Sequence, residues 1–245
     1  MASLFKQAKR GLRQRAGAWL HDAVHNAPDG VRKRLGPGLC YFEMLVLDYG
    51  IARVLYNNRH RISPEAWRSA QPAPHHIASA ARRGVKTVLN LRGDRSFGTM
   101  WLEERACARH GVKLVNIVLR SRAAPSREEL HAIKALLDTI TYPVLIHCKS
   151  GADRAGLMSA LYRIEREGVP VEEARHQLSL KYGHIRQADT GVLDYFFERY
   201  LADNARTPIA FWDWVETKYD ADEVNSSFRA SSFANRLVNG VLHRE

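Results

Sequence analysis

The sequence predicts an α/β fold in which a central, mostly parallel sheet is flanked by helices on both faces. Two observations support this class. Three short runs of β-branched and apolar residues resemble buried strands, and a helical pattern precedes each of them. Strands that alternate with helices form parallel sheets covered on both sides. A chain of 245 residues with 45% hydrophobic residues is long enough to bury such a core.

Each strand of the predicted sheet follows a helix with a recognisable start or end. We expect helices at about 75–83, 99–110 and 125–141, followed by strands at 85–91, 112–119 and 144–148. Gly84 and Gly111 separate the first two helices from their strands, as glycine commonly does after a helix. Ser126 and Glu129 form a capping-box pattern at the start of the third helix.

The pattern after Gly151 is helical. One helix follows directly, and three more are expected at about 171–182, 190–203 and 208–219. Residues 221–245 form a polar and basic tail whose apolar residues are spaced for one further amphipathic helix. We therefore assign residues 39–220 to one domain, with its core at about 60–200.

The first 38 residues form an additional basic segment, with eight basic residues against two acidic ones. Apolar residues recur at three- to four-residue steps from Leu4 to Ala23, which predicts a basic amphipathic helix. Such a helix docks on an anionic membrane surface or packs on the domain with its basic face in solvent, and a mitochondrial transit peptide is a third, less favoured interpretation. Residues 28–38, rich in Pro and Gly, are expected to be a connector, and 39–55 a buried helix.

Composition narrows the partners and the compartment. The net charge of +11 favours anionic partners, but no motif or interleaving of aromatic and basic residues supports nucleic-acid binding. Three scattered cysteines predict neither a disulfide framework nor a zinc site. Our expectation for the chain is no metal and no cofactor. No secretory signal pattern is present. We expect a cytoplasmic protein, peripheral on the inner face of a membrane if the N-terminal helix binds lipid.

The stretch VLIHCKSGADRAGL places Cys148 at the carboxyl end of a strand and Arg154 at the start of a helix. Ligands bind at this edge of open α/β sheets. Successive backbone N–H groups here can form a nest that, with the helix dipole, favours phosphate and the thiolate of Cys148. Arg154 can hold two phosphoryl oxygens. The predicted phosphate-binding residues are Lys149, Ser150, Gly151, Ala152, Asp153 and Arg154.

HCKSGADRAG closely resembles the HCxxGxxR signature of the protein tyrosine and dual-specificity phosphatase superfamily. WRSAQP at 67–72 resembles the YRS-x-QP motif of its atypical plant-and-fungal and bacterial branch, and the resemblance covers about residues 60–200. It implies a dual-specificity phosphatase-like fold and a metal-free reaction in which Cys148 attacks phosphorus and water hydrolyses the phosphocysteine. The implied substrates are phosphomonoesters of phosphoproteins, notably phosphotyrosine, or of phospholipid headgroups.

The loop that usually carries this family's general acid, an Asp, contains none here. Glu128 and Glu129 lie near it but fit the first turn of a helix. Asp153 matches the position at which myotubularin-type and Sac-type lipid phosphatases carry an Asp, so it is expected either as the catalytic acid and base or as a helix-start carboxylate that orients a neighbour. Asp94, after the first predicted strand, is the alternative general acid.

Ala155 is a second departure, because this position usually carries Ser or Thr, whose hydroxyl stabilises the thiolate as phosphocysteine breaks down. It predicts slow turnover and leaves open a catalytically weak or inactive phosphoryl-binding, membrane-associated module. A rhodanese-type sulfur transferase is disfavoured by Arg154. His147, at the end of the strand, is expected to brace the loop or tune the thiol without a direct proton transfer.

Overall fold

The structure, a computed structural model, describes residues 19, 22, 26, 28–47, 55–93 and 98–230. It divides into two compact units. The first comprises Met1–Val118 and Thr141–Gly151, and the second comprises Leu119–Ile140 and Ala152–Glu245. The chain passes from the first unit to the second within the loop that joins a strand ending at His147 to a helix beginning at Asp153.

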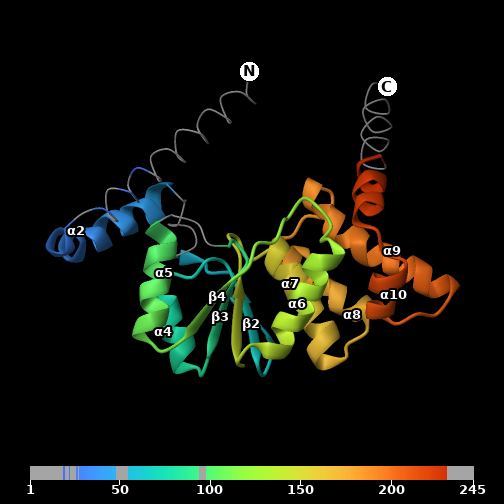
Figure 1. Ribbon diagram of the computed structural model, residues 1–245, viewed down its shortest axis with the longest axis horizontal. Helices are drawn as coiled ribbons and strands as arrows, with labels where there is room; N and C mark the ends of the chain where they lie inside the picture. Colours follow the sequence, from blue (N-terminus) through green and yellow to red (C-terminus); the bar gives the residue numbers. More distant parts are fainter. Residues whose placement is uncertain are drawn as a thin grey trace, which may run out of the picture. The chain divides into compact units, whose positions relative to one another are not determined.

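The first unit is built on a five-stranded sheet of order β1-β2-β5-β3-β4 (Figure 1). Its strands are β1 (His60–Ser63), β2 (Ala66–Ser69), β3 (Thr87–Asn90), β4 (Lys113–Asn116) and β5 (Val144–His147). Only the β1–β2 pair among these strands is antiparallel. All four residues of β3 and of β5 are buried, as expected for inner strands of a parallel sheet. The predicted α/β class, a mostly parallel sheet flanked by helices, is confirmed.

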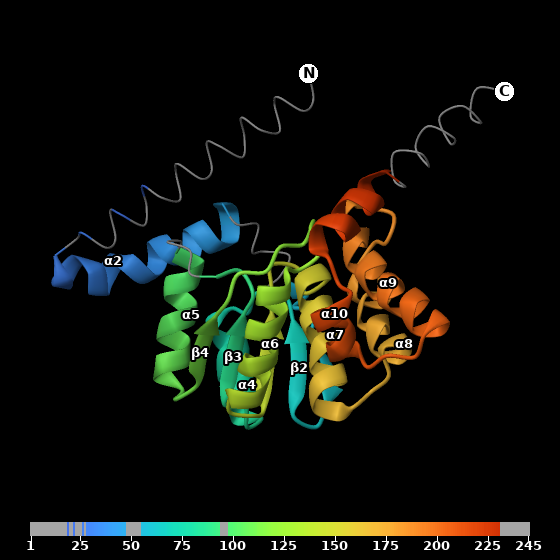
Figure 2. The same ribbon diagram turned by 45° about the vertical axis from the view of Figure 1, so that its right-hand side comes forward.

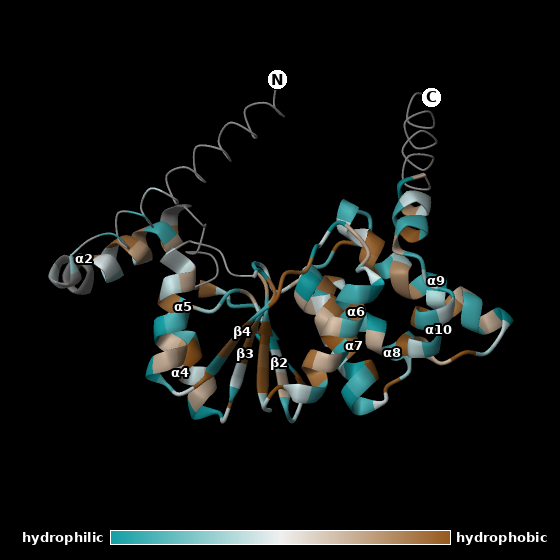
Figure 3. Ribbon diagram, viewed as in Figure 1, coloured by the Kyte–Doolittle hydropathy of each residue, from teal (hydrophilic) through white to brown (hydrophobic). Residues whose placement is uncertain are grey.

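Helices α4 (Pro74–Arg82) and α5 (Gly98–Arg109) pack against this sheet, as the sequence predicted. In Figure 3 hydrophobic residues concentrate along the strands, whereas α4 and α5 carry both hydrophobic and hydrophilic turns. The shared core consists of Ile77, Ala80, Val85, Val88, Ala106, Cys107, Val112 and Leu145. Burial, with the nearby Glu103 and Glu104, raises the pKa of Cys107 to about 12, so this thiol stays protonated.

The hairpin of β1 and β2 was not predicted. The two strands are joined by a turn at Pro64 and Glu65, but neither strand shows the alternation of apolar and polar residues that identifies a half-buried strand. The side chain of Arg68 in β2 is fully buried, whereas a sequence pattern places an arginine at the surface.

The predicted connector at 28–38 is wrong, because helix α2 (Asp29–Phe42) runs through it with Pro37 inside. A π-helical turn, η1 (Glu43–Leu47), continues it. Cys40 and Met44 pack on Ala73 and Leu102, and the Glu43 carboxylate accepts a hydrogen bond from Thr99 N at 3.1 Å. The stabilisation from these contacts exceeds the cost of the helical hydrogen bond that is missing because Pro37 has no N–H. At Gly98 a Cβ would lie 2.9 Å from Cys40 Cα, so this approach requires glycine.

The buried helix predicted at 39–55 is only half buried where it is described. Cys40, Glu43 and Met44 are buried, whereas Leu39, Tyr41 and Phe42 are exposed. Residues 48–54 and almost all of the predicted amphipathic helix at 4–23 lie outside the described residues. Within the described ranges, no helix has the length and apolarity needed to cross a bilayer.

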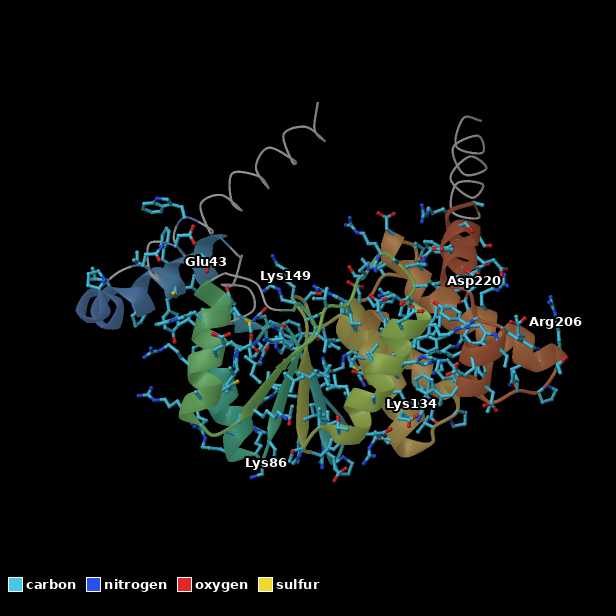
Figure 4. All side chains as sticks on the ribbon, in the orientation of Figure 1. Glu43, Lys86, Lys134, Lys149, Arg206 and Asp220 are labelled. Atoms are coloured by element: carbon cyan, nitrogen blue, oxygen red, sulfur yellow. The ribbon has the colours of Figure 1, made fainter. Side chains whose placement is uncertain are left out.

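The second unit is helical (Figure 2). Its main helices are α6 (Arg127–Thr139), α7 (Asp153–Glu167), α8 (Val171–Ala174), α9 (Val192–Arg206) and α10 (Phe211–Thr217), and residues 221–230 are also helical. Lys134 of α6, labelled in Figure 4, forms an ion pair with Glu165 of α7 at 3.0 Å. The buried Phe196 ring of α9 packs within about 6 Å of the rings of Phe211, Trp214 and Tyr219.

The single helix predicted at 171–182 is wrong. The segment is divided into α8 and two 3₁₀ turns, η2 (Arg175–Gln177) and η3 (Leu180–Tyr182). Ser179 is extended, and its carbonyl accepts hydrogen bonds from the N–H groups of Tyr182 and His184. This local turn replaces the helical hydrogen bonds and buries Leu178 and Tyr182.

The aromatic cluster around Phe196 leads to a test of stability. Replacing Phe196 by Ala should lower the free energy of unfolding of the second unit by about 3–5 kcal/mol, since a fully buried ring leaves a cavity. Urea denaturation followed by tryptophan fluorescence measures the loss. Ile185→Ala, which truncates a side chain that is 51% exposed, is the control and should change the free energy by less than about 0.5 kcal/mol. Equal losses in the two variants would contradict the assignment of this core.

Candidate active site

The loop after β5 turns three successive carbonyl groups toward neighbouring residues of the first unit. The Gln71 N–H donates to Lys149 O at 3.2 Å, Asn58 Nδ2 donates to Ser150 O at 3.0 Å, and Arg68 Nη2 donates to Gly151 O at 2.8 Å. In a trans peptide the N–H of the next residue points opposite to the carbonyl. The amide groups of residues 150–152 therefore point away from these donors.

The direction of those amides is visible at the cysteine. Gly151 N–H donates to Cys148 Sγ at 3.3 Å, while the Ser150 carbonyl of the same peptide bond is held by Asn58. Cys148 is 1% exposed. The thiol and an inward-pointing amide thus lie on the same side of the loop, which is the side on which an anion would be bound.

Gly151 allows the loop to lie against the end of β2. Its φ is +76°, and a Cβ on it would lie 2.6 Å from Ala70 N and 2.8 Å from Ser69 O. A side chain here would collide with backbone atoms, which cannot move aside as a flexible side chain can. The glycine of the motif is therefore required by packing as well as by its backbone conformation.

A row of buried polar side chains supports the strand that ends at the cysteine. His147 Nε2 lies 2.6 Å from Glu103 Oε1, and both side chains are fully buried. Gln71 Nε2 donates to the other oxygen of Glu103 at 2.5 Å, and Arg92 donates to the Gln71 side-chain oxygen. His147 Nδ1 lies 3.3 Å from Cys148 O. His147 is thus held by partners that place it beside the loop, and its ring nitrogens face Glu103 and a carbonyl.

The sequence did not identify Asn58, Arg68, Gln71 and Glu103 as site residues. WRSAQP, which contains Arg68 and Gln71, indicated a family resemblance but no role for either side chain. A buried role for Glu103 could have been inferred from its position, because it lies among the buried residues on the core side of α5. Asn58 gave no such indication, because its φ of +47°, unusual for a non-glycine residue, is known only from the structure.

The predicted site residues fall in both units. Cys148, Lys149, Ser150 and Gly151 belong to the first unit, and Lys149 lies just beyond the end of β5 (Figure 4). Ala152, Asp153 and Arg154 belong to the second unit, where Ala152 precedes α7 and the other two lie in its first turn. Asp94 lies outside the described residues, so its role stays a prediction.

Asp153 is bound by a buried histidine. Its Oδ1 lies 2.7 Å from His184 Nδ1, and His184 Nε2 lies 2.6 Å from Asp194 Oδ2 in the first turn of α9. Burial alone would lower the pKa of His184, but the hydrogen bonds to Asp153 and Asp194 outweigh it and raise that pKa to about 9. The neighbour of Asp153 is therefore an imidazolium, which the sequence did not predict.

The carboxylates near residues 120–126 are those of Glu128 and Glu129, and both lie in the first turn of α6. Ser126 Oγ accepts from Glu129 N at 3.2 Å, and Glu129 Oε2 accepts from Ser126 N at 2.8 Å, which confirms the predicted capping box. A hydrogen bond with Ser126 lowers the pKa of Glu128. The preceding loop is fixed within the second unit, since Tyr219 Oη donates to Pro125 O at 2.5 Å and Asn225 Oδ1 accepts from Ala124 N at 2.8 Å.

The close approach at Gly151 leads to a test. Gly151→Ala should lower the free energy of unfolding by about 2–4 kcal/mol, because it combines a strained backbone with an overpacked contact. Gly84→Ala is the matched control in the same unit, since Gly84 has a φ of +89° but no atom lies within 4 Å of the position that its Cβ would take. It should cost only about 1 kcal/mol. Chemical denaturation measures both, and similar losses would contradict the packing argument.

The His184 ion pairs lead to a pH-dependent test. Because the folded-state pKa is raised from 6.5 to about 9, the stabilisation is fully present below pH 6.5 and is lost as pH rises through 9. His184→Gln should lower the free energy of unfolding by about 2 kcal/mol at pH 6, after allowance for solvent screening, and by much less at pH 10. Urea denaturation at several pH values measures the difference. A difference that does not vary with pH would contradict the assignment, and exposed His176→Gln should show little effect.

Comparison with known proteins places these residues in a family. Residues 56–191 match the family described as "DSP-PTPase phosphatase fused to NAD+ Kinase". The dual specificity protein phosphatase TpbA of Pseudomonas aeruginosa (strain UCBPP-PA14) is 31% identical over 122 residues, which is 49% of this chain and 53% of that protein. The chain thus spans about half the length of the curated relatives it matches.

Two solved structures show similarity at a lower level. The crystal structure of P. aeruginosa TpbA is 21% identical, covers 70% of this chain and 90% of its own, and gives a TM-score of 0.46. That of PTPMT1 is 21% identical, covers 61% of this chain and 99% of its own, and gives a TM-score of 0.45. The family match, in contrast, extends over more than half of the 245 residues and contains the whole HCKSGADR motif, so the chain belongs to this DSP-PTPase family.

Proposed function

We propose that this chain is a cysteine-dependent phosphatase that hydrolyses a phosphomonoester through a phosphocysteine intermediate. The observation that best supports the proposal is the anchoring of three loop carbonyls, on Lys149, Ser150 and Gly151, by donors of the first unit. It directs amide N–H groups to the side of the loop that carries Cys148 Sγ. Fixed donors of this kind stabilise the charge of a phosphoryl group during transfer, and they need no rearrangement at the moment of reaction.

In the first step the Cys148 thiolate attacks phosphorus, and the bond from phosphorus to the ester oxygen breaks. Arg154, which follows the loop in the chain, is proposed to bind two phosphoryl oxygens through its planar guanidinium group. In the second step water attacks phosphorus, the bond from phosphorus to sulfur breaks, and phosphate leaves. We assign Asp153 to the proton transfers of the reaction, with Asp94 as the alternative general acid.

The proposed substrates are a phosphoprotein, notably one with phosphotyrosine, or a phospholipid headgroup. Both present a phosphate monoester dianion, which matches the basic charge of the chain. A cytoplasmic location, with the basic segment 1–38 on an anionic membrane surface, is part of the proposal and is supported only by the composition of that segment.

A second candidate function is a module that binds a phosphoryl group with little turnover. Ala155 favours it, because this buried position offers no hydroxyl to stabilise the departing thiolate in the second step. The two candidates share the anion-binding loop and differ only in the rate at which phosphocysteine is hydrolysed.

The decisive experiment is hydrolysis of p-nitrophenyl phosphate by the full chain. Cys148→Ser should lower kcat by more than about 10³-fold, because the hydroxyl is a far weaker nucleophile at neutral pH than a thiolate. Cys107→Ala is the matched control, since Cys107 is a protonated core thiol and its loss should leave kcat within about twofold. Acid quenching followed by mass spectrometry should detect phosphate on Cys148.

Three outcomes separate the alternatives. Turnover that persists in Cys148→Ser would overturn the cysteine mechanism. Absence of turnover on p-nitrophenyl phosphate, phosphotyrosine peptides and phosphoinositides, with retained binding of phosphate analogues such as tungstate, would favour the binding module. A burst of p-nitrophenol followed by a slow steady rate would assign the limiting step to phosphocysteine hydrolysis, as Ala155 predicts.

A further inference from the structure

The exposed hydrophobic side chains of the protein are concentrated in one part of the chain. Among the residues that the structure describes, all but three of the exposed large hydrophobic side chains lie between residues 19 and 56. Single exposed hydrophobic residues are normal on a protein surface, whereas a group of them marks a surface that another molecule covers. Helix α2 contributes four members of this group, namely Leu35, Leu39, Tyr41 and Phe42.

The spacing of three of these residues places them on one side of α2. Leu35, Leu39 and Phe42 follow one another at steps of four and three positions, which separate neighbours along one face of a helix. Their exposed fractions are 61%, 38% and 53%. Cys40 and Met44, in contrast, are buried in a hydrophobic cluster of the first unit. We call Leu35, Leu39 and Phe42 the outer face of α2.

The outer face points away from helix α5. The N–H groups in the first turn of a helix point out of its N-terminal end. The Thr99 N–H, in the first turn of α5, donates to the Glu43 carboxylate of η1. The segment formed by α2 and η1 therefore lies across that end of α5 (Figures 1 and 2). Because Cys40 and Met44 pack on the inner side of this segment, its outer face is directed outward.

The end of α5 that α2 covers lies at the edge of the sheet that carries the catalytic loop. Helix α5 follows β3, and the loop that contains Cys148 follows β5, which is a parallel neighbour of β3. The carboxyl ends of parallel strands meet at the same edge of a sheet. Figure 4 shows Glu43 and Lys149 at this edge and Lys86, which precedes β3, at the opposite edge. All of these residues belong to the first unit.

Two further exposed side chains of the group, Leu55 and Tyr56, come from the same edge. They precede Asn58, whose Nδ2 donates to the Ser150 carbonyl of the catalytic loop at 3.0 Å. Tyrosine is enriched where a bilayer meets water, because its ring is apolar and its hydroxyl is polar. Exposed hydrophobic residues thus lie close to the loop in the chain as well as on α2.

The charge beside the outer face distinguishes among the molecules that could cover it. Arg32, Lys33 and Arg34 directly precede Leu35 in α2, and residues 1–27 carry five basic residues against one acidic residue. A second copy of this chain, or residues 1–27 themselves, would therefore bring like charges together on this face. An anionic bilayer attracts basic residues at its surface and takes up apolar side chains below its headgroups.

We propose that the outer face of α2 is a docking surface for an anionic lipid bilayer, which holds the first unit with its catalytic-loop edge toward the lipid headgroups. The docking surface goes beyond the proposed phosphatase function and does not require it. The consequence for catalysis rests on that function, because the loop would then meet phosphate esters that are presented at the membrane.

The first test measures binding of the full chain to lipid vesicles by co-sedimentation. Vesicles of phosphatidylcholine with about one third phosphatidylglycerol should bind the chain at least about tenfold more tightly than vesicles of phosphatidylcholine alone, and added salt should weaken this binding. The double variant Leu35→Gln, Phe42→Gln should lower the affinity for the anionic vesicles at least about tenfold. It leaves the net charge unchanged, so the loss reports the apolar contact.

The matched control is the double variant Leu180→Gln, Ile185→Gln. It also replaces two exposed apolar side chains by glutamine, but both lie in the second unit and outside α2. This variant should bind the anionic vesicles as wild type does. Urea denaturation should give the same midpoint for both double variants and wild type, because only exposed side chains change. Equal losses of binding in the two double variants, or unchanged binding in the α2 variant, would overturn the proposal.

Other molecules on the outer face would give different results. A second copy of the chain would appear in light scattering as a dimer that the α2 double variant dissociates, with no binding of wild type to vesicles. Coverage by residues 1–27 would appear as a loss of stability in the α2 double variant, again with no binding of wild type to vesicles. Either result would overturn the proposal.

The second test measures the consequence for catalysis with an aryl phosphate carried on a lipid anchor. On anionic vesicles, wild type should hydrolyse the anchored ester at least about tenfold faster than the same ester in solution, because docking raises its effective concentration at the loop. The ratio of the two rates should fall to about one in the α2 double variant. A ratio of one in vesicle-bound wild type would overturn the proposed orientation. A chain that binds vesicles but hydrolyses neither ester would overturn the phosphatase function and leave the docking surface standing.

Discussion

The hydrogen bonds that hold the carbonyls of residues 149–151 are the constraint on which the candidate site depends. A short loop has no hydrogen-bond ladder of its own, and its peptide groups would otherwise be free to rotate. One carbonyl each is bound by Gln71, Asn58 and Arg68. Because the peptide group is planar, fixing a carbonyl also fixes the direction of the N–H on the opposite side of the same peptide group. The direction of the loop amides is thus set by residues that lie outside the loop.

Of these donors, Arg68 is the one whose burial is energetically most costly. Its side chain is fully buried in a short strand, and its guanidinium donates to a neutral carbonyl at 2.8 Å. Burying a charge is costly unless it is well hydrogen-bonded, so a residue in this position has to be compensated by its surroundings. The positive charge also lies behind a loop that is proposed to bind an anion, where it adds to the favourable field.

A second layer of polar residues fixes the strand itself. Glu103 of α5 links His147, at the end of β5, to Gln71 in the segment after β2. Gln71 contributes twice, because its backbone N–H holds the loop and its side chain joins Glu103 to Arg92 at the end of β3. The ends of three strands are therefore connected through one buried network, and such networks define a single arrangement only when all members are in place.

The sequence predicted well what depends on local pattern. The parallel strands, the helices before them and the Ser126 capping box follow from hydrophobic periodicity and from residue types at fixed offsets. Cys148 and Arg154 became candidates because the motif is contiguous. The partners of the loop could not be found in this way, since Arg68 and Gly151 are 83 positions apart and Asp153 and His184 are 31 apart. Local pattern likewise missed α2, where tertiary packing outweighs Pro37.

The hairpin that carries Arg68 also has a consequence for the solubility of the protein. Strand β1 lies at one edge of the sheet, where unpaired backbone groups can recruit a strand from another molecule. Its register shifts between Arg61 and Ser63, and Pro64 follows directly. A short strand with a bulge and a proline is a poor template for further pairing. The segment that organises the loop therefore also blunts an edge of the sheet against edge-to-edge aggregation.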